Sequence, residues 1–241
     1  MLLLDIGNSR CKWAWSSANG VWLQQGAFNN TDTGAWEKLK VTFAGQAAPQ
    51  KILASNVAGA AMRQNVRELC AIWSVEPEVI VAQAEQCGVY NAYEHPAQLG
   101  SDRWAALLAA WQRVHGACLV VGCGTATTVD ALSDRGEFLG GLILPGMELM
   151  QLSLLQNTAQ LGRESGEPRS FPRNTADAIV SGVIRATTGA IRYQYNLLAS
   201  QGPAHCIVSG GGASGLLPHL DIGAEQVENL VLHGLQIIGQ S

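Results

Sequence analysis

The chain repeats one local pattern at a spacing of about 117 residues, so that a shifted copy lays Gly124 on Gly7. Each copy has a short apolar strand, a glycine turn and a second strand. The turns are Asp5-Ile-Gly-Asn-Ser and Gly122-Cys-Gly-Thr-Ala, and a second turn follows each of them, Asn19-Gly20 and Asp134-Arg135-Gly136. A repeat of this length predicts two similar structural units within one chain.

Hydrophobic periodicity extends the repeat beyond the turns. In the first half, the pattern predicts strands at 2–7, 11–15 and from 21, a helix near 32–44, a strand at 51–58, a helix at 60–74 and a strand at 78–84. In the second half, it predicts a third strand at 138–144, a helix from about 174 to 200, a strand at 205–209 and a helix near 229–239. Chance similarity of two short turns is the alternative, but the shared order of elements favours duplication. We predict two lobes, 1–115 and 116–241, with both glycine turns at the base of a cleft.

Composition excludes several classes of protein. Charged residues make up 14% and apolar residues 47% of the chain, and its net charge of −4 comes without a basic run, which argues against disorder and against a nucleic-acid partner. The start, MLLLDIGNS, has too few apolar residues for a signal sequence, and no window approaches the ~18 apolar residues of a membrane span. The six cysteines occur singly, without metal-ligand spacing. We expect a cytoplasmic protein with reduced cysteines and no membrane partner.

The first glycine turn has the residues of a phosphate-binding loop. Gly7 lets the backbone approach an anion, and the side chains of Asn8 and Ser9 can donate hydrogen bonds to phosphate oxygens. Asp5, at the end of the strand, is suited to hold a hydrated Mg²⁺ through water, and Lys12 can add positive charge. Taken alone, the same residues are also compatible with a simple hairpin containing an Asx turn.

Two further glycine segments suit a nucleotide. Gly124-Thr125-Ala126-Thr127 combines bare backbone with hydroxyl groups, and Ser209-Gly-Gly-Gly-Ala213 follows an apolar strand and precedes a helix, which suits a base or ribose. A flexible loop is the alternative for the second segment. The sequence contains no P-loop motif, and the strand after Thr127 excludes the dinucleotide-binding fingerprint, which requires a helix there.

A candidate general base lies in the segment Leu99-Gly100-Ser101-Asp102-Arg103-Trp104, where a helix is expected to begin. The apolar spacing that starts at Trp104 predicts a helix with Ser101 or Asp102 as its cap. The positive end of a helix favours a carboxylate, and a neighbouring Arg103 can bind an anion. Asp102 is therefore either a helix cap alone or the group that orients and deprotonates a substrate hydroxyl. Upstream, Tyr90 and Tyr93 lie in a polar loop, where they either line a pocket or cover the edge of the core.

Together these residues resemble the type III pantothenate kinases, which belong to the superfamily of ATP-binding folds that includes the sugar kinases and actin. The matching motifs run through nearly the whole chain in order: Asp5-x-Gly-Asn-Ser, Tyr93, Leu99-Gly-Ser-Asp-Arg103, Gly124-Thr-Ala-x-Thr128, Gly140-Gly141-x-Ile143-x-Pro145-Gly146, Asn174-Thr175-x-x-Ala178 and Gly210–Gly212. The resemblance implies the duplicated actin-like (ribonuclease H-like) α/β ATPase fold, two βββαβαβα lobes around a nucleotide cleft. It also implies ATP-dependent phosphorylation of pantothenate to 4′-phosphopantothenate, the first step of coenzyme A biosynthesis.

The resemblance assigns roles to matched positions. Asp102 is expected to be the catalytic base, and Asp5 to hold Mg²⁺ through water. ATP is expected to contact Asp5, Ile6, Gly7, Asn8, Ser9, Arg10, Cys11, Lys12 and Thr125. The pantothenate site is expected to comprise Tyr93, Gly100, Ser101, Asp102, Arg103 and Thr175, completed by the second subunit of a homodimer that contacts its partner through helix 174–200.

The chain departs from the family at Gly122, where the resemblance implies an aspartate associated with a required K⁺ or NH₄⁺ ion. Without that carboxylate, we expect a weak or absent dependence on a monovalent cation. The sequence leaves the conformation of residues 157–173 undefined, and we expect a mobile loop near the substrate side. Taken without the resemblance, the residues leave two alternatives open: a sugar or acetate phosphotransferase on the same fold, and a non-catalytic ATP-binding regulatory protein.

Overall fold

The computed structural model describes residues 1–157 and 166–241, and the described chain separates into two compact units. Unit 1 consists of Met1–Arg113 and Asn229–Ser241, and unit 2 consists of Val114–Glu228. The C-terminal segment of the chain is thus part of unit 1, whereas the expected lobes at 1–115 and 116–241 assign it to the second half.

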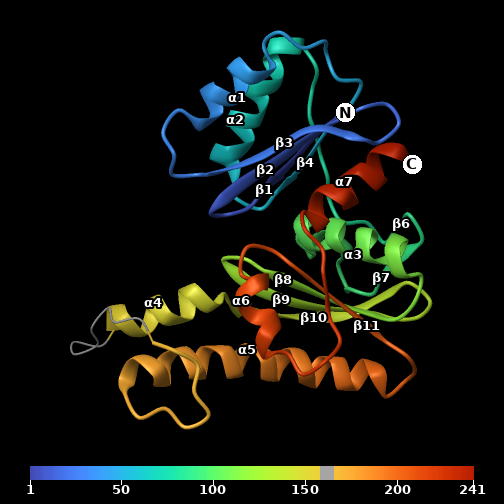
Figure 1. Cartoon of the computed structure of the whole chain (residues 1–241). Helices are drawn as coiled ribbons and strands as arrows, with labels where there is room; N and C mark the ends of the chain where they lie inside the picture. Colours follow the sequence, from blue (N-terminus) through green and yellow to red (C-terminus); the bar gives the residue numbers. More distant parts are fainter. Residues whose placement is uncertain (158–165) are drawn as a thin grey trace. The chain divides into compact units, whose positions relative to one another are not determined.

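Unit 1 is built on a five-stranded mixed sheet (Figure 1) with the order β3-β2-β1-β4-β5. Strands β1 (Leu2–Ile6), β2 (Arg10–Ser16) and β3 (Trp22–Asn29) form an antiparallel meander, and β4 (Ile52–Asn56) and β5 (Glu78–Val79) add parallel to β1. The connecting helices are α1 (Ala35–Phe43) and α2 (Ala60–Cys70). The unit also contains a hairpin of β6 (Glu85–Gln86) and β7 (Val89–Asn91), helix α3 (Ser101–Val114), whose last residue falls in unit 2, and helix α7 (Leu230–Gln240).

Alternation along β1 separates the two faces of this sheet. Leu2, Leu4 and Ile6 belong to the core cluster that contains Phe43 of α1 and Leu69 of α2. Each of these side chains is fully buried and contributes roughly 2 kcal/mol by burial. The opposite face carries Leu3 and Asp5, because successive side chains of a strand point to opposite sides.

The C-terminal helix packs on the face that carries Leu3. A Cβ atom at Gly239 would lie 3.0 Å from Leu53 Cδ1, and one at Gly234 would lie 1.9 Å from the carbonyl oxygen of Ala105 in α3. Helix α7 also contacts the edge strand β3, where Trp22 stacks on His233 with ring centroids 4.5 Å apart. Helix α7 is therefore an integral part of unit 1.

Unit 2 repeats the topology of unit 1. Strands β8 (Cys118–Cys123), β9 (Ala126–Leu132) and β10 (Glu137–Pro145) are antiparallel, and β11 (His205–Ser209) and β12 (Glu225–Gln226) add parallel to β8. Their order, β12-β11-β8-β9-β10, matches the order of unit 1 strand for strand. Its helices are α4 (Met147–Asn157), the long α5 (Thr175–Ala199) and the short α6 (Ala213–Leu216). The duplication predicted from the sequence is confirmed.

Three local features differ from the sequence-based expectations. Helix α4 was not predicted, because Met147–Asn157 is apolar on several sides and shows no helical period. The loop around Tyr90 contains the short hairpin β6–β7. Of the loop expected at 157–173, residues 158–165 lie outside the described residues, residue 157 ends α4, and 166–173 run as irregular backbone to α5.

Within residues 1–157 and 166–241, no helix has the length and apolar character needed to cross a bilayer. All six cysteines are free, and every one except Cys87 is buried, as expected for reduced core residues.

Candidate active site

The end of strand β1 brings three polar side chains into one row. In the sheet register, Asp5 lies opposite Lys12 of β2 and opposite Ser55 of β4. Directly paired residues of neighbouring strands project to the same side of a sheet. The row therefore lies on the face away from α1 and α2.

Asp5 has an unusual electrostatic environment. Its side chain is partly buried, and this burial raises its pKa from 3.8 to about 7, against the opposing effect of Lys12. The negative charge of Asp102 also raises the pKa of Asp5, which indicates that the two carboxyl groups are near each other. The site thus concentrates negative charge that a bound cation can balance.

The conformation of the turn after β1 is fixed by hydrogen bonds to its backbone. The N–H of Gly7 donates to the carbonyl of Arg10 at 3.0 Å. Asn30 Nδ2 donates to the carbonyls of Gly7 and Asn8 at 2.7 and 3.0 Å, and the N–H of Asn30 donates to the carbonyl of Ser9 at 2.9 Å. Sequence reasoning missed Asn30, because it comes from the end of the distant strand β3 and its surrounding Asn-Asn-Thr-Asp run reads only as a generic loop.

The predicted ATP-binding residues of this turn divide by exposure. Asn8, Ser9 and Arg10 are exposed, so their side chains can reach a ligand. Ile6 and Cys11 are fully buried, and burial raises the pKa of the Cys11 thiol. Neither residue is accessible to a ligand in this structure, so the expected ATP contacts at these two positions rest on the family resemblance.

Helix α3 begins at Ser101, so its cap lies one residue earlier than predicted. The carbonyl of Gly100 accepts from the N–H of Trp104 at 2.9 Å, so Gly100 takes the cap position and Ser101 lies inside the first turn. The expectation that Ser101 or Asp102 caps the helix is therefore wrong. Instead, Asp102 Oδ1 accepts from the N–H of Arg103 at 2.8 Å, and a Cβ atom at Gly100 would lie 2.7 Å from that same oxygen.

The Ser101 hydroxyl has a different partner, which sequence reasoning missed. Its Oγ lies 2.9 Å from Oγ of Ser55, in a buried hydrogen bond between α3 and β4. The available signal was weak: Ser55 follows the three apolar residues that begin strand Ile52–Asn56, and such a polar residue near a strand end is common.

Arg103 and Tyr93 form the adjoining part of the site. Arg103 is only 7% exposed; its Nη1 donates to the Tyr93 hydroxyl at 3.2 Å, and its guanidinium carbon lies 5.9 Å from the Tyr93 ring centroid. The loop that carries Tyr93 is fixed by Asn91, another residue that the sequence analysis missed. Asn91 accepts from the N–H of Tyr93 and donates to the carbonyl of Pro96.

The second glycine turn, in unit 2, is enclosed by backbone. The N–H of Gly146 donates to the carbonyl of Thr125 at 2.8 Å, and a Cβ atom at Gly146 would lie 2.3 Å from the Gly124 carbonyl oxygen. On the other side, a Cβ atom at Gly210, where φ is +106°, would lie 2.3 Å from the Cys123 carbonyl oxygen. The glycine run at 210–212 is therefore packed against this turn, which rules out the alternative of a loose loop.

The two turns differ in charge at equivalent positions. Where unit 1 pairs Asp5 with Lys12, unit 2 pairs Gly122 with Thr128. A Cβ atom at Gly122 would lie 2.7 Å from Thr128 Oγ1, so the space beside this glycine is taken by a hydroxyl.

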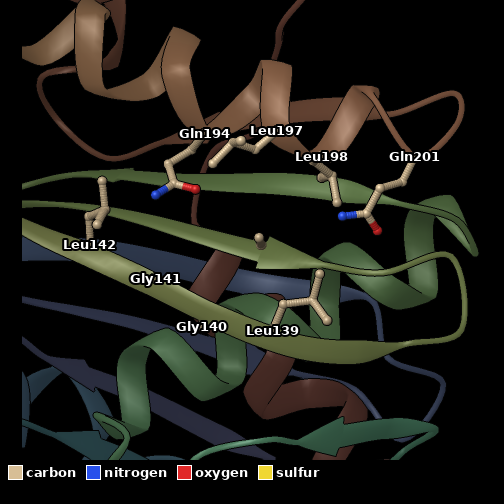
Figure 2. A pocket seen from close by; sticks show the side chains of 9 residues that line it. Leu139, Gly140, Gly141, Leu142, Gln194, Leu197, Leu198 and Gln201 are labelled. Carbon is tan, nitrogen blue, oxygen red and sulfur yellow. The ribbon is translucent and has the colours of Figure 1, made fainter.

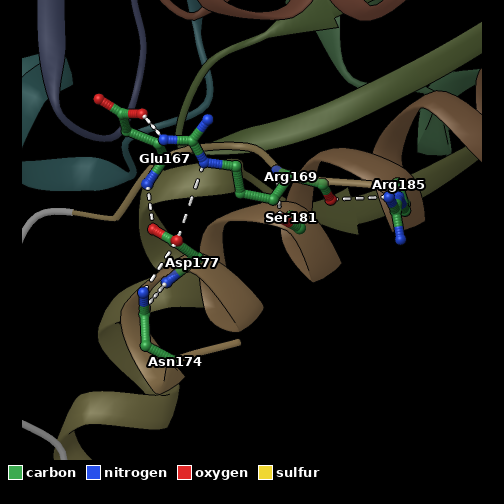
Figure 3. Close-up of polar contacts among 6 residues, drawn as sticks. All are labelled: Glu167, Arg169, Asn174, Asp177, Ser181 and Arg185. Carbon is green, nitrogen blue, oxygen red and sulfur yellow. Dashed lines mark hydrogen bonds and ion pairs between the residues drawn. The ribbon is translucent and has the colours of Figure 1, made fainter. Parts of the chain in front are cut away.

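Thr175 is the first residue of α5. A short segment that precedes Thr175 in the sequence is hydrogen-bonded to side chains of α5 (Figure 3). We call residues Glu167–Ser170 the strap. Asp177 Oδ1 accepts from the N–H of Glu167 at 2.7 Å, Ser181 Oγ accepts from the N–H of Arg169 at 2.9 Å, and Arg185 donates to the carbonyls of Arg169 and Ser170. The N–H of Asp177 also donates to Oδ1 of Asn174, the cap of α5. The strap and the cap together fix the backbone on both sides of Thr175.

Neither of two cavities in the described units contains a predicted site residue. One of about 270 Å³ lies between α5 and β10 (Figure 2), where the amides of Gln194 and Gln201 face Leu139 and Leu142. The other, of about 230 Å³, lies in unit 1 near Trp13.

The predicted site residues therefore fall into separate groups. Unit 1 brings together the glycine turn, Asp102 and its neighbours, and Tyr93, whereas Thr125 and Thr175 belong to unit 2. In the described part of the chain, no three His, Cys, Asp or Glu side chains cluster as metal ligands. A hydrated Mg²⁺ needs only one or two carboxylates beside phosphate oxygens, so Asp5, next to Asp102, fits such an ion.

Both the sequence and the structure are similar to those of known proteins. A family model described as type III pantothenate kinase matches residues 1–197. A type III pantothenate kinase of Nitrosospira multiformis is 45% identical over 242 residues, covering 100% of this chain and 91% of the relative. One from Aromatoleum aromaticum is 42% identical over 240 residues, covering 100% and 98%. Among solved structures, a Sinorhizobium meliloti protein described as a 2-dehydro-3-deoxygalactonokinase superposes with a TM-score of 0.63 at 16% identity, covering 99% of this chain and 98% of the other, which supports the fold.

Proposed function

The chain belongs to the type III pantothenate kinases, which phosphorylate pantothenate with ATP in coenzyme A biosynthesis, and we propose that its residues around Asp5 and Asp102 carry out this transfer. Family membership decides between the alternatives that the residues alone left open. The observation that carries the proposal is the junction between the two residues: Ser55, which lies opposite Asp5 in the sheet register, is hydrogen-bonded to Ser101, the residue before Asp102.

ATP is proposed to bind with its phosphates at the turn between β1 and β2. Backbone N–H groups and the exposed side chains of Asn8 and Ser9 are suitable donors, and Lys12 adds positive charge on the same face as Asp5. The turn in unit 2 is proposed to contribute Thr125. Asp5 would hold Mg²⁺ through water, and the bound ion would neutralise charge on the transferred phosphoryl group.

Asp102 is proposed to accept the proton of the primary hydroxyl of pantothenate. Phosphoryl transfer asks for positioning and charge stabilisation more than for covalent chemistry by the protein. As the hydroxyl oxygen attacks the γ-phosphorus, its O–H bond breaks, the proton goes to the Asp102 carboxylate, and ADP leaves with the electrons of the broken P–O bond. Gly100 supports this role, because any larger residue there would crowd the carboxylate.

Pantothenate is proposed to be held by Tyr93, Gly100, Ser101, Arg103 and, from unit 2, Thr175. Arg103 is nearly buried and donates a hydrogen bond to the Tyr93 hydroxyl, so it is suited to orient that hydroxyl toward the substrate. Contact between Arg103 and the substrate carboxylate rests on the family resemblance.

The pantothenate site is proposed to be completed by the second subunit of a homodimer, with α5 at the contact. Gly182, Ala186, Gly189 and Tyr193 follow one stripe of this helix, and a Cβ atom at either glycine would meet nothing within 4 Å. Such a stripe allows close approach of another helix. Light scattering should give twice the chain mass of 25.5 kDa, and Ala186→Glu should give monomers with reduced activity. A fully active wild-type monomer would contradict the shared site.

Two further properties complete the proposal. The enzyme is proposed to work in the cytoplasm, a reducing compartment that suits its free cysteines. It is expected to need little or no K⁺ or NH₄⁺, because Gly122 offers no carboxylate and its neighbour Thr128 supplies only a hydroxyl.

The decisive experiment is Asp102→Asn in an ADP-release assay with pantothenate, simple sugars and acetate as acceptors. We expect the wild type to use pantothenate, and the variant to keep its KM values but lose kcat by a factor of about 100 or more. Asp134→Asn, in the exposed turn after β9, is the control for the loss of one carboxylate. Near-normal turnover by Asp102→Asn would contradict the assignment of the base.

A further inference from the structure

Two serine hydroxyls are buried together in unit 1. Ser55, near the end of β4, is fully buried, Ser101 is 8% exposed, and their Oγ atoms lie 2.9 Å apart. A buried hydroxyl must be hydrogen-bonded to avoid a desolvation penalty, and two apolar groups of the same size would fill this space without that requirement. Simple packing therefore does not explain the pair.

The pair joins the two parts of the proposed active site. On one side, Ser55 lies opposite Asp5 in the parallel register of β1 and β4. On the other side, Ser101 immediately precedes Asp102. The same junction is reinforced two residues beyond Ser55, where the N–H of Val57 donates to the carbonyl of Ile6 at 3.1 Å and Val57 Cγ1 lies 3.9 Å from the Cβ position of Gly100.

We propose that Ser55 is a positioning residue for phosphoryl transfer, whose hydroxyl fixes the start of α3, and with it Asp102, relative to the Asp5 carboxylate. This inference rests on the proposed roles of Asp5 and Asp102. Ser55 acts through Ser101 and is not assigned a contact with either substrate. A displacement of about 1 Å in reacting groups can lower the rate about 100-fold. Because Ser55 acts only through Ser101, we expect its loss to lower kcat by about 10-fold.

The test is the steady-state kinetics of Ser55→Ala. We expect kcat to fall about 10-fold, while the KM values for ATP and pantothenate stay within about twofold. The proposed pantothenate contacts at the start of α3 shift together with Asp102, and the proposed ATP contacts lie on the turn after β1. Ser16→Ala is the matched control: Ser16 is a buried serine of the same unit, and within the described residues its hydroxyl has no hydrogen-bond partner, so kcat should not change. An unchanged kcat in Ser55→Ala would overturn the proposal.

The double variant Ser55→Ala/Ser101→Ala separates positioning from stability. Each single variant leaves one buried hydroxyl without its partner, whereas the double variant removes both and should recover melting temperature. The proposal expects kcat to stay low in the double variant. Recovery of kcat together with stability would show a purely structural role. If Ser55→Ala fails to fold, Ser55→Cys keeps similar packing with a weaker donor, and the same fall in kcat at constant KM is expected, although smaller; an unchanged kcat there would also overturn the proposal.

Repeating Ser55→Ala in the Asp102→Asn background separates failure of this inference from failure of the proposed function. No further loss of kcat is expected there, because Ser55 acts through Asp102. An equal 10-fold loss in both backgrounds would overturn the coupling. Near-normal activity of Asp102→Asn alone would overturn the proposed base, whereas a normal Ser55→Ala beside an inactive Asp102→Asn would overturn only the role of Ser55.

Discussion

Replacing Asp5 by Asn should make the metal-free protein more stable at neutral and alkaline pH while removing kinase activity. Burial and Asp102 raise the pKa of Asp5 from 3.8 to about 7, so the folded protein resists its ionisation. A tenfold change in that equilibrium corresponds to about 1.4 kcal/mol, which gives at most about 4 kcal/mol for the whole change in pKa. Water that reaches this partly exposed group reduces the effect, and we expect about 2 kcal/mol.

The sign follows from proton binding. Between pH 4 and pH 7 the folded protein binds a proton at Asp5 that the unfolded chain has already lost, so the free energy of unfolding falls as pH rises through this range. Asn at position 5 lacks this dependence. The variant and the wild type should therefore have similar stability near pH 4, and the variant's advantage should grow until about pH 7 and then stay constant.

Tryptophan fluorescence during urea unfolding in a chelator is the appropriate assay, because all seven tryptophans lie in unit 1 together with Asp5. The stability difference is measured at pH 5, 6, 7 and 8. Asp134→Asn, at an exposed turn of unit 2, makes the same change in net charge, and any pH dependence that it shows is subtracted. A difference that does not grow between pH 5 and pH 8 would refute the reasoning, as would an Asn variant that is less stable at pH 8.

Three further predictions follow from particular positions. Replacing NaCl by KCl at constant ionic strength should change kinase activity little, because Gly122 provides no carboxylate; strict, saturable activation by K⁺ would contradict this. Asp177→Ala should raise the KM for pantothenate about tenfold and leave that for ATP nearly unchanged, because it releases the strap that precedes Thr175; an equal change in both constants would argue against a local effect. Gly234→Ala should destabilise unit 1 by about 3 kcal/mol in urea unfolding, since its Cβ would lie 1.9 Å from the Ala105 carbonyl oxygen, and an effect below about 1 kcal/mol would mean that α7 shifts freely.

Two of these predictions have matched controls in the chain. Asp221→Ala removes an exposed carboxylate that pairs only at the surface with Arg192, so the KM values should not change. Gly45→Ala adds a methyl group where nothing lies within 4 Å, so the stability of unit 1 should change little.

The duplicated fold could be predicted because its signals are local. Gly7 and Gly124 each mark a turn between strands whose apolar residues recur with a period of two, and this period does not depend on distant parts of the chain. Helix α4 escaped prediction for the complementary reason: Met147–Asn157 has no one-sided apolar pattern. The hairpin β6–β7 escaped because its strands are too short for a period to appear.

In the site, the exposed turn and Asp102 could be predicted from residue type and spacing, whereas their supporting residues could not. Asn30 binds the turn from 22 residues away, and Ser55 binds Ser101 across 46 residues. Such contacts depend on strand register and on where a helix begins. The assumption that Ser101 caps α3 concealed its actual partner, because a capping hydroxyl would have been used locally.

The two unusual features of unit 1 have one explanation if the proposed roles hold. A carboxylate whose pKa is raised to about 7 opposes folding of the metal-free protein, and a buried hydroxyl pair gives no advantage over apolar packing. The Asp5 carboxylate and the Ser55 hydroxyl lie on the same face of the sheet, because Asp5 and Ser55 are paired residues of the neighbouring strands β1 and β4. Selection for stability alone would remove each of them separately. Their occurrence together is expected if unit 1 trades stability for a fixed separation between the residue that holds the metal and phosphates and the residue that activates the hydroxyl. Asp5→Asn and Ser55→Ala should then have opposite effects on stability and the same direction of effect on kcat.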